Sequence, residues 1–133
     1  MKSIPRTGTT GQQTFVVTAQ HAIDFAGGGM PAVLSTPWLI WFLEHAAREA
    51  MLPLLEPGES TVGIRVDVEH LAPTPVGDRV TCTARVLQVD GPVVSFQLEA
   101  KDSREVISRG FHKLRVIRVD RFAARVAAKA KPV

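Results

Sequence analysis

The sequence contains a single cysteine, Cys82, which excludes an intramolecular disulfide and a cysteine-based metal cluster. The opening segment 1–13 is polar and lacks the apolar core of a secretory signal. The longest apolar stretch, residues 37–43, is far too short to span a membrane. We therefore expect a soluble, cytoplasmic protein, a location that the lone cysteine also suits.

Most of the chain lacks a net excess of either positive or negative charge. The net charge is +3, from 16 Lys and Arg against 13 Asp and Glu, but residues 1–119 hold twelve of each sign. The surplus lies in residues 120–133, where four basic side chains accompany Asp120 alone. This neutral body argues against a nucleic-acid-binding protein. We expect neither a nucleic-acid nor a membrane partner, and a basic tail over residues 121–133.

Hydrophobic periodicity predicts one long helix and several strands in a single domain, residues 1–133, with a loose arm over residues 1–12. Thr36 is a good N-cap, Pro37 suits the first helical position, and Pro53 ends the helix. The first half of this helix is apolar on every side, which predicts burial. Strands are expected at 14–20, 61–70, 79–90, 93–101 and 105–119.

The order of these elements predicts the fold. The last three strands are joined by short turns and form an antiparallel meander. A helix that is apolar all round must be surrounded, so the sheet must curve around it. This is an α+β hotdog fold, a curved antiparallel sheet wrapped around one long central helix. One helix and one sheet cannot bury all the apolar side chains of such a subunit, so we expect a homodimer.

Two residues of the helix are candidates for chemistry. Glu44 follows seven uncharged residues, and a carboxylate in a buried helix must be paired, hydrogen-bonded or protonated. It either reaches water where the helix becomes amphipathic or faces a pocket as a base or nucleophile. Thr36 either caps the helix or presents its hydroxyl to a substrate at the positive helix end.

A third candidate, His70, ends a strand-like run and is structural, solvated or catalytic. Its competitors are His21, His45 and His112. The sequence contains no His-x-x-x-His pair and no accompanying carboxylate cluster, so we expect no metal site. It also lacks a Gly-x-Ser-x-Gly elbow, which excludes the usual serine nucleophile.

The residues around these candidates resemble the fluoroacetyl-CoA thioesterase family of the hotdog superfamily. The similarity lies in the run STP at 35–37, the helix that follows, and the phrase EPGES…VG…V…H…APTPVG. It covers roughly residues 14–122 and includes the later segment GFHKLRVIRVDRF. The resemblance implies an enzyme that hydrolyses an acyl-CoA thioester without a further cofactor. The catalytic trio that it implies is Thr36, Glu44 and His70.

The resemblance also implies roles for these residues. Glu44 attacks the thioester or activates water, His70 manages protons, and Thr36 orients the acyl group or the carboxylate. The backbone N–H of Gly63 is a candidate donor to the thioester carbonyl. A straight helix separates Thr36 from Glu44 by about 12 Å along its axis. Either the helix starts later than Thr36, or the trio assembles across a dimer interface.

The sequence departs from the family upstream of Thr36. Where the fluoroacetyl specialist has bulky aromatic residues, this chain has GGGMPAVLS. Gly27–Gly29 is interpreted as flexible backbone, either a plain connector or a mobile flap. Met30 is adaptable and is expected to line the acyl pocket, with Phe25 as a further candidate. We therefore expect a short or unusual acyl group other than fluoroacetyl.

Other functions stay open from the residues. One alternative is a non-catalytic hotdog protein that binds acyl-CoA or a related small ligand, and another is a structural protein whose basic tail binds an acidic partner. A hotdog dehydratase is a third, although its Asp-x-Asn-Pro-x-His-like run is absent. The phosphates of CoA need positive charge near the pocket mouth. The strands offer Arg79, Arg109, Lys113 and Arg115, among which the sequence does not choose.

Overall fold

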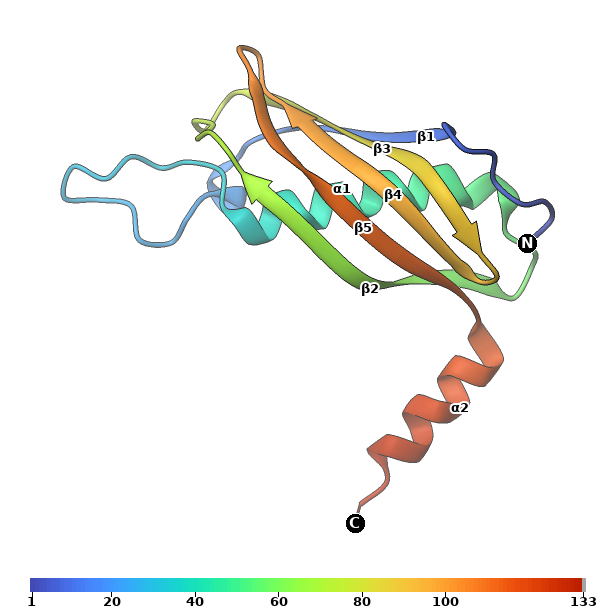
Figure 1. The fold of residues 1–133 in the computed structure, drawn as a ribbon. Coiled ribbons are helices and arrows are strands. Elements are labelled where there is room, and N and C mark those ends of the chain that lie inside the picture. Colours follow the sequence, from blue (N-terminus) through green and yellow to red (C-terminus); the bar gives the residue numbers. More distant parts are fainter. Residues whose placement is uncertain (133) are drawn as a thin grey trace.

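A computed structural model describes residues 1–132 and places a curved five-stranded sheet around one long helix (Figure 1). Neighbouring strands pair antiparallel in the order β1-β3-β4-β5-β2, as expected for a strand, a helix and a later meander. In chain order the elements are β1 (Thr10–Val16), η1 (Ala19–His21), α1 (Thr36–Met51), η2 (Leu52–Leu54), β2 (Glu59–His70), β3 (Arg79–Asp90), β4 (Val93–Lys101), β5 (Val106–Arg118) and α2 (Val119–Ala130).

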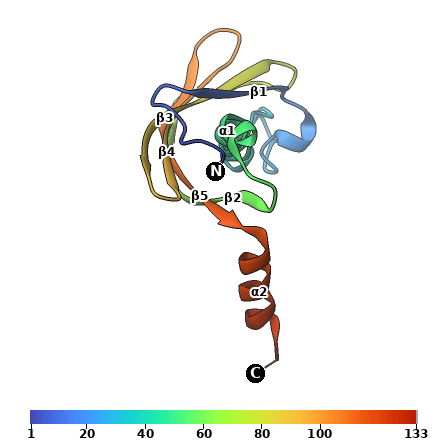
Figure 2. The ribbon, with the colours of Figure 1, turned by 90° about the vertical axis from the view of Figure 1, so that its right-hand side faces the viewer.

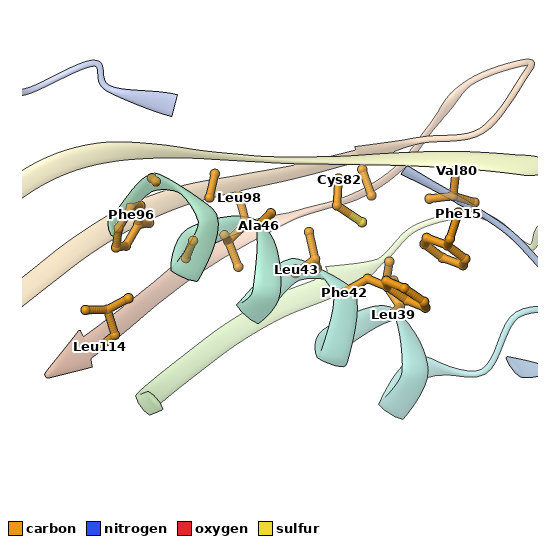
Figure 3. Packing of buried hydrophobic residues seen from close by; sticks show 14 of the residues in the cluster. Phe15, Leu39, Phe42, Leu43, Ala46, Val80, Cys82, Phe96, Leu98 and Leu114 are labelled. Atoms are coloured by element: carbon orange, nitrogen blue, oxygen red, sulfur yellow. The ribbon is translucent and has the colours of Figure 1, made fainter. Parts of the chain in front are cut away.

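The core lies between α1 and the concave face of the sheet (Figures 2 and 3). The helix buries residues at three- and four-residue spacing, and β3 and β4 bury every second residue, so each element turns one apolar face inward. Full burial of a large aliphatic or aromatic side chain contributes roughly 1.5–3 kcal/mol. The principal contacts of this layer come from Leu39, Phe42, Leu43, Ala46, Val80, Cys82, Phe96 and Leu98.

The close approach of β1 to the helix explains one glycine. A Cβ on Gly11 would lie 2.1 Å from the carbonyl oxygen of Ala46 and 2.6 Å from the amide nitrogen of Ala50. Only glycine permits this backbone-to-backbone contact. Substitution would therefore push the first strand away from α1 and open the core.

The expectation that the first half of α1 is buried on every side is wrong. The sheet curls around only part of the helix and leaves one side open (Figure 2). Trp41 is 43% exposed there, and Thr36 and Pro37 are exposed as well. Ser35 rather than Thr36 occupies the N-cap position, which makes Thr36 the first helical residue.

The two ends of the chain also differ from expectation. The arm over residues 1–12 is not loose, because the N-terminal ammonium of Met1 lies 2.8 Å from a carboxylate oxygen of Glu59 and the amide of Gly8 donates to Val86. The expected basic tail is largely a helix, α2, which projects from the body (Figure 1). Val133, the last residue of that tail, lies outside the described residues. Within residues 1–132, no helix is long and apolar enough to cross a membrane.

Candidate active site

Thr36 and His70 meet at one end of the barrel-like body. Thr36 is the first residue of α1 and His70 is the last residue of β2, and the Thr36 Oγ1 lies 2.8 Å from the His70 Nδ1. The other ring nitrogen, Nε2, is buried without a hydrogen-bond partner among the described residues. Burial lowers the pKa of His70, and the nearby Ala72 backbone partly offsets this shift. A neutral imidazole with one free nitrogen is suited to exchange a proton with a ligand.

A cavity of about 340 Å³ opens beside this pair. Phe25 and Met30, the two predicted pocket residues, line it together with Thr36 and His70. The remaining walls are apolar and come from residues 23, 33–34 and 71–73. Phe25 is 66% exposed and Met30 is 44% exposed, so one side of this cavity is uncovered in a single chain.

The segment that carries Phe25 and Met30 is a projecting ribbon with paired backbone. Gly27 and Met30 exchange two backbone hydrogen bonds of 2.8 and 3.0 Å. Gly28 and Gly29 form the tight turn between them, with φ values of 59° and 92° that favour glycine. Gly27–Gly29 thus adopt backbone conformations that favour glycine and form a defined turn.

Glu44 lies in a second cavity, also about 340 Å³, on the other part of α1. A Cβ on Gly63 would come within 2.6 Å of the Glu44 Oε1, so the absent side chain makes room for the carboxylate. β2 has a register irregularity between Gly63 and Arg65, and such bulges reorient the strand backbone beside functional groups. Glu44 and Gly63 therefore lie side by side within one chain.

His112 is a residue of this second cavity that sequence reasoning left among the competitors. Its side chain is 2% exposed, and its Cε1 would lie 3.2 Å from a Cβ on Gly63. The Nδ1 is 2.9 Å from the carbonyl oxygen of Arg65. Because a carbonyl oxygen can only accept, Nδ1 carries the hydrogen and donates the hydrogen bond. Burial lowers the pKa of His112, while the Arg65 backbone and Glu44 partly offset the shift. His112 therefore presents a neutral ring beside the carboxylate.

The other two histidines have structural partners. The Nδ1 of His21 accepts a hydrogen bond from the amide of Thr18 at 3.1 Å, and its ring packs edge-on against Trp38. The His45 Nδ1 donates to the carbonyl oxygen of Trp41 at 2.7 Å, and the two rings stack at 3.7 Å. Neither cavity holds a metal-binding cluster, since the described residues contain no group of three metal-ligating side chains.

The predicted trio is divided between the two cavities of one chain. Thr36 and His70 share the first, and Glu44 lies in the second. The eight-residue separation on α1 corresponds to a rise of about 12 Å. Along β2, Gly63 and His70 are separated by about 23 Å of extended strand. A single chain therefore brings together Thr36 with His70 and Glu44 with Gly63, but does not unite the two pairs.

The buried histidines predict a pH dependence of stability. Their pKa values are lowered in the folded state from an unfolded value near 6.5, so the unfolded chain binds more protons once the pH falls below this value. We expect the free energy of unfolding to decrease as the pH is lowered from 7 to 5. His112→Asn keeps a donor for the Arg65 carbonyl but removes the titration, and should flatten this decrease. Urea unfolding at each pH measures the effect, and an unchanged slope in the variant would contradict a neutral buried His112.

Comparisons with known proteins identify the family and the fold. Residues 17–120 match the family described as fluoroacetyl-CoA-specific thioesterase. A fluoroacetyl-CoA thioesterase from Streptantibioticus cattleyicolor is 36% identical, over 97% of each chain. A crystal structure of a variant fluoroacetyl-CoA-specific thioesterase has a TM-score of 0.88 at 33% identity, covering 97% of this chain and 100% of that one. A Thermus thermophilus thioesterase superfamily member has a TM-score of 0.87 at 28% identity, covering 94% and 93%. The predicted hotdog fold is confirmed.

Proposed function

The chain belongs to the fluoroacetyl-CoA-specific thioesterase family, and we propose that it hydrolyses a short acyl-CoA other than fluoroacetyl-CoA at a site assembled from two protomers. The chain is an acyl-CoA thioester hydrolase. In this reaction the oxygen of water adds to the acyl carbon, the carbon–sulfur bond breaks, and the CoA sulfur leaves with a proton. The protein must therefore supply a carboxylate or base, a proton donor, and hydrogen bonds to the thioester oxygen.

The free edge of β2 supports a homodimer. Among residues 1–132, no strand pairs with the outer side of β2. The strand is twelve residues long, contains no proline, and is exposed on both faces from Gly63 to Asp67. Ile64 is 47% exposed and Val66 is 38% exposed. Natural proteins rarely leave so long an edge strand uncovered, because its free backbone groups readily pair with another strand.

The single observation that carries the shared site is the position of the two half-sites along this edge. Gly63, beside Glu44, lies near the start of β2, and His70, beside Thr36, lies at its end. Two copies of β2 that pair antiparallel about a two-fold axis near Val66 bring each His70 beside the partner's Gly63. Each catalytic site then contains Thr36 and His70 of one protomer and Glu44 and Gly63 of the other.

The chemical roles follow from these positions. Glu44 supplies the carboxylate that attacks the acyl carbon or removes a proton from the attacking water. His70 is neutral and has a free Nε2, which suits it to carry the proton that the leaving sulfur requires. Thr36 fixes the His70 ring through the 2.8 Å contact. The Gly63 backbone is the proposed donor to the thioester oxygen, because the absent side chain lets a ligand approach its amide closely.

The acyl group is proposed from the cavity beside His70. Phe25 and Met30, on either side of the turn at Gly28 and Gly29, line this cavity, and the Met30 side chain adapts its shape readily. This wall is built differently from the aromatic cover expected of a fluoroacetyl specialist. A cytoplasmic location is part of the proposal, supported by the unpaired, buried Cys82.

A panel of acyl-CoA thioesters tests the proposed substrate class. We expect thiol release to be fastest for short acyl groups, with fluoroacetyl-CoA hydrolysed less efficiently than the best substrate, because Met30 and the glycine turn shape a different pocket. The measurement is kcat/KM for acetyl-, fluoroacetyl-, propionyl-, butyryl- and longer acyl-CoA. Fluoroacetyl-CoA as the best substrate would overturn the proposed acyl preference, and no hydrolysis of any member would favour a non-catalytic binding protein.

A further inference from the structure

The helix α2 has an apolar stripe that nothing in its own chain covers. It follows β5 directly, and the amide of Val119 donates to the carbonyl of Gly58 just before β2, at 2.9 Å. From there it extends past the free edge of β2, as both ribbon views show (Figures 1 and 2). Val119–Ala130 buries none of its residues. Val119, Phe122 and Val126 are 46%, 42% and 50% exposed, and their spacing places them on one face.

A row of positive charge runs beside this apolar stripe. Arg121, Arg125 and Lys129 follow one another at four-residue spacing, so they lie on one face of α2, about 100° around the helix from the apolar stripe. None of the three forms an ion pair with another described residue. They account for most of the positive surplus of a chain whose body is neutral.

A second uncovered apolar surface lies at the opposite end of β2. Phe25, Met30 and Leu71 are 66%, 44% and 50% exposed and line the cavity beside Thr36 and His70. One protomer thus carries an apolar helix face at the start of the edge strand and an apolar cavity rim at its end. An antiparallel two-fold pairing of β2 places the start of one strand next to the end of the other, and so places each α2 near the partner's cavity rim.

We propose that α2 docks on the partner subunit, covers the open side of the partner's acyl cavity with its apolar stripe, and presents Arg121, Arg125 and Lys129 to the phosphates of the bound CoA. The inference rests on the proposed dimeric thioesterase. Phe122 and Val126 gain an apolar contact for faces that are otherwise in water. The three cations gain the polyanionic partner that their own chain lacks, at the mouth of the pocket where the nucleotide end of CoA leaves the protein.

Neutralising the row of charge tests the assignment. In the triple variant Arg121→Gln, Arg125→Gln, Lys129→Gln we expect KM for the acyl-CoA and the Kd for free CoA to rise about tenfold, since each exposed charge contact contributes up to about 1 kcal/mol. KM for the same acyl group on pantetheine, which carries no phosphate, should change less than twofold. Arg85→Gln, an exposed cation on β3, is the matched control and should leave both constants unchanged.

Substituting the apolar stripe tests the docking. Phe122→Asp with Val126→Asp should raise KM for the acyl-CoA and for the acyl-pantetheine together, because the cavity loses its cover as well as its charges. Neither side chain is buried in its own chain, so the fold of each subunit should be retained, and cooperative thermal unfolding of the variant checks this. Unchanged KM values in this variant would overturn the docking.

A mixed dimer shows which protomer's helix serves which site. The protomer with the neutralised helix is paired with a His70→Gln protomer, and the mixed dimer is isolated with two affinity tags. Its one site with an intact His70 takes α2 from the His70→Gln partner, so we expect a wild-type KM. A KM raised as in the triple variant would mean that α2 serves its own chain. An equal rise in KM for acyl-CoA and acyl-pantetheine in the triple variant would overturn the phosphate contact.

A wild-type protein that hydrolyses no acyl-CoA would overturn the proposed function instead. The Kd for free CoA would then still show whether α2 binds the phosphates.

Discussion

Replacing Glu44 by Gln should reduce kcat by about a thousandfold and leave KM almost unchanged. Positioned acid–base groups contribute roughly 10²- to 10⁴-fold to a rate, and Gln matches Glu in size but can neither attack the acyl carbon nor accept the proton of water. The side chain sits in the hollow left by Gly63, so the variant fills the same space. Free thiol release with saturating acyl-CoA measures kcat, and thermal unfolding reports whether the fold is retained.

Glu49→Gln is the matched control for this substitution. Glu49 lies on the same helix but is exposed, and its carboxylate makes one long contact of 3.3 Å with Gln13. We expect kcat within twofold of wild type. If Glu44→Gln retained more than a tenth of the wild-type kcat while remaining folded, Glu44 would be excluded as the base or nucleophile. A raised KM with unchanged kcat would make it a binding residue instead.

The strands of the sheet were predictable where one face is buried. The bounds of β3 and β4 agree with the predicted ranges, because buried residues alternate with more exposed ones along both strands. β2 has no such alternation in its middle, where both faces are exposed, and its start at Glu59 lies two residues before the predicted one. The weak pattern is itself informative, since it marks the edge that has no neighbour in a single chain.

Features that depend on long-range contacts could not be predicted from local patterns. The N-terminal arm has a composition typical of a loose segment, but long-range contacts hold it in place. These are the ion pair of Met1 with Glu59, 58 residues away, and the backbone hydrogen bond from Gly8 to Val86. The glycine ribbon likewise depends on backbone pairing between Ala22 and Leu34 and between Gly27 and Met30. Local composition suggests that such segments are loose. It contains no information about the distant residues that hold them in place.

The catalytic candidates show the same division. The family resemblance implies a trio of Thr36, Glu44 and His70, and one chain brings Thr36 together with His70 but leaves Glu44 beside Gly63. His112 could have been found from the residues, because alternation along β5 places it on the buried face with Leu114. A polar residue at such a position indicates a partner or a function. The separation of Thr36 from Glu44 could be predicted from helix geometry. The proposal that the free edge of β2 reunites the trio required the topology of the sheet.

A pair of inactive variants should restore activity when combined in one dimer. Glu44→Gln and His70→Gln protomers, co-expressed and isolated as the mixed dimer with two affinity tags, contain one site that has both intact residues if the site is shared. The other site has neither. We therefore expect about half of the wild-type activity per dimer, from two parents that are each nearly inactive. Thiol release by the purified mixed dimer measures this recovery.

The reciprocal combination makes the result unambiguous. A protomer that carries both substitutions is paired with a wild-type protomer, so each shared site has one defective residue and the mixed dimer should be nearly inactive. A site confined to one chain gives the opposite pattern: about half activity for wild type with the double variant, and none for the two single variants together. Within one protomer the two pairs line separate cavities, about 12 Å apart along α1 and about 23 Å apart along β2. Complementation in the first pair and inactivity in the second follow from that separation and from the proposed antiparallel pairing of β2 between protomers.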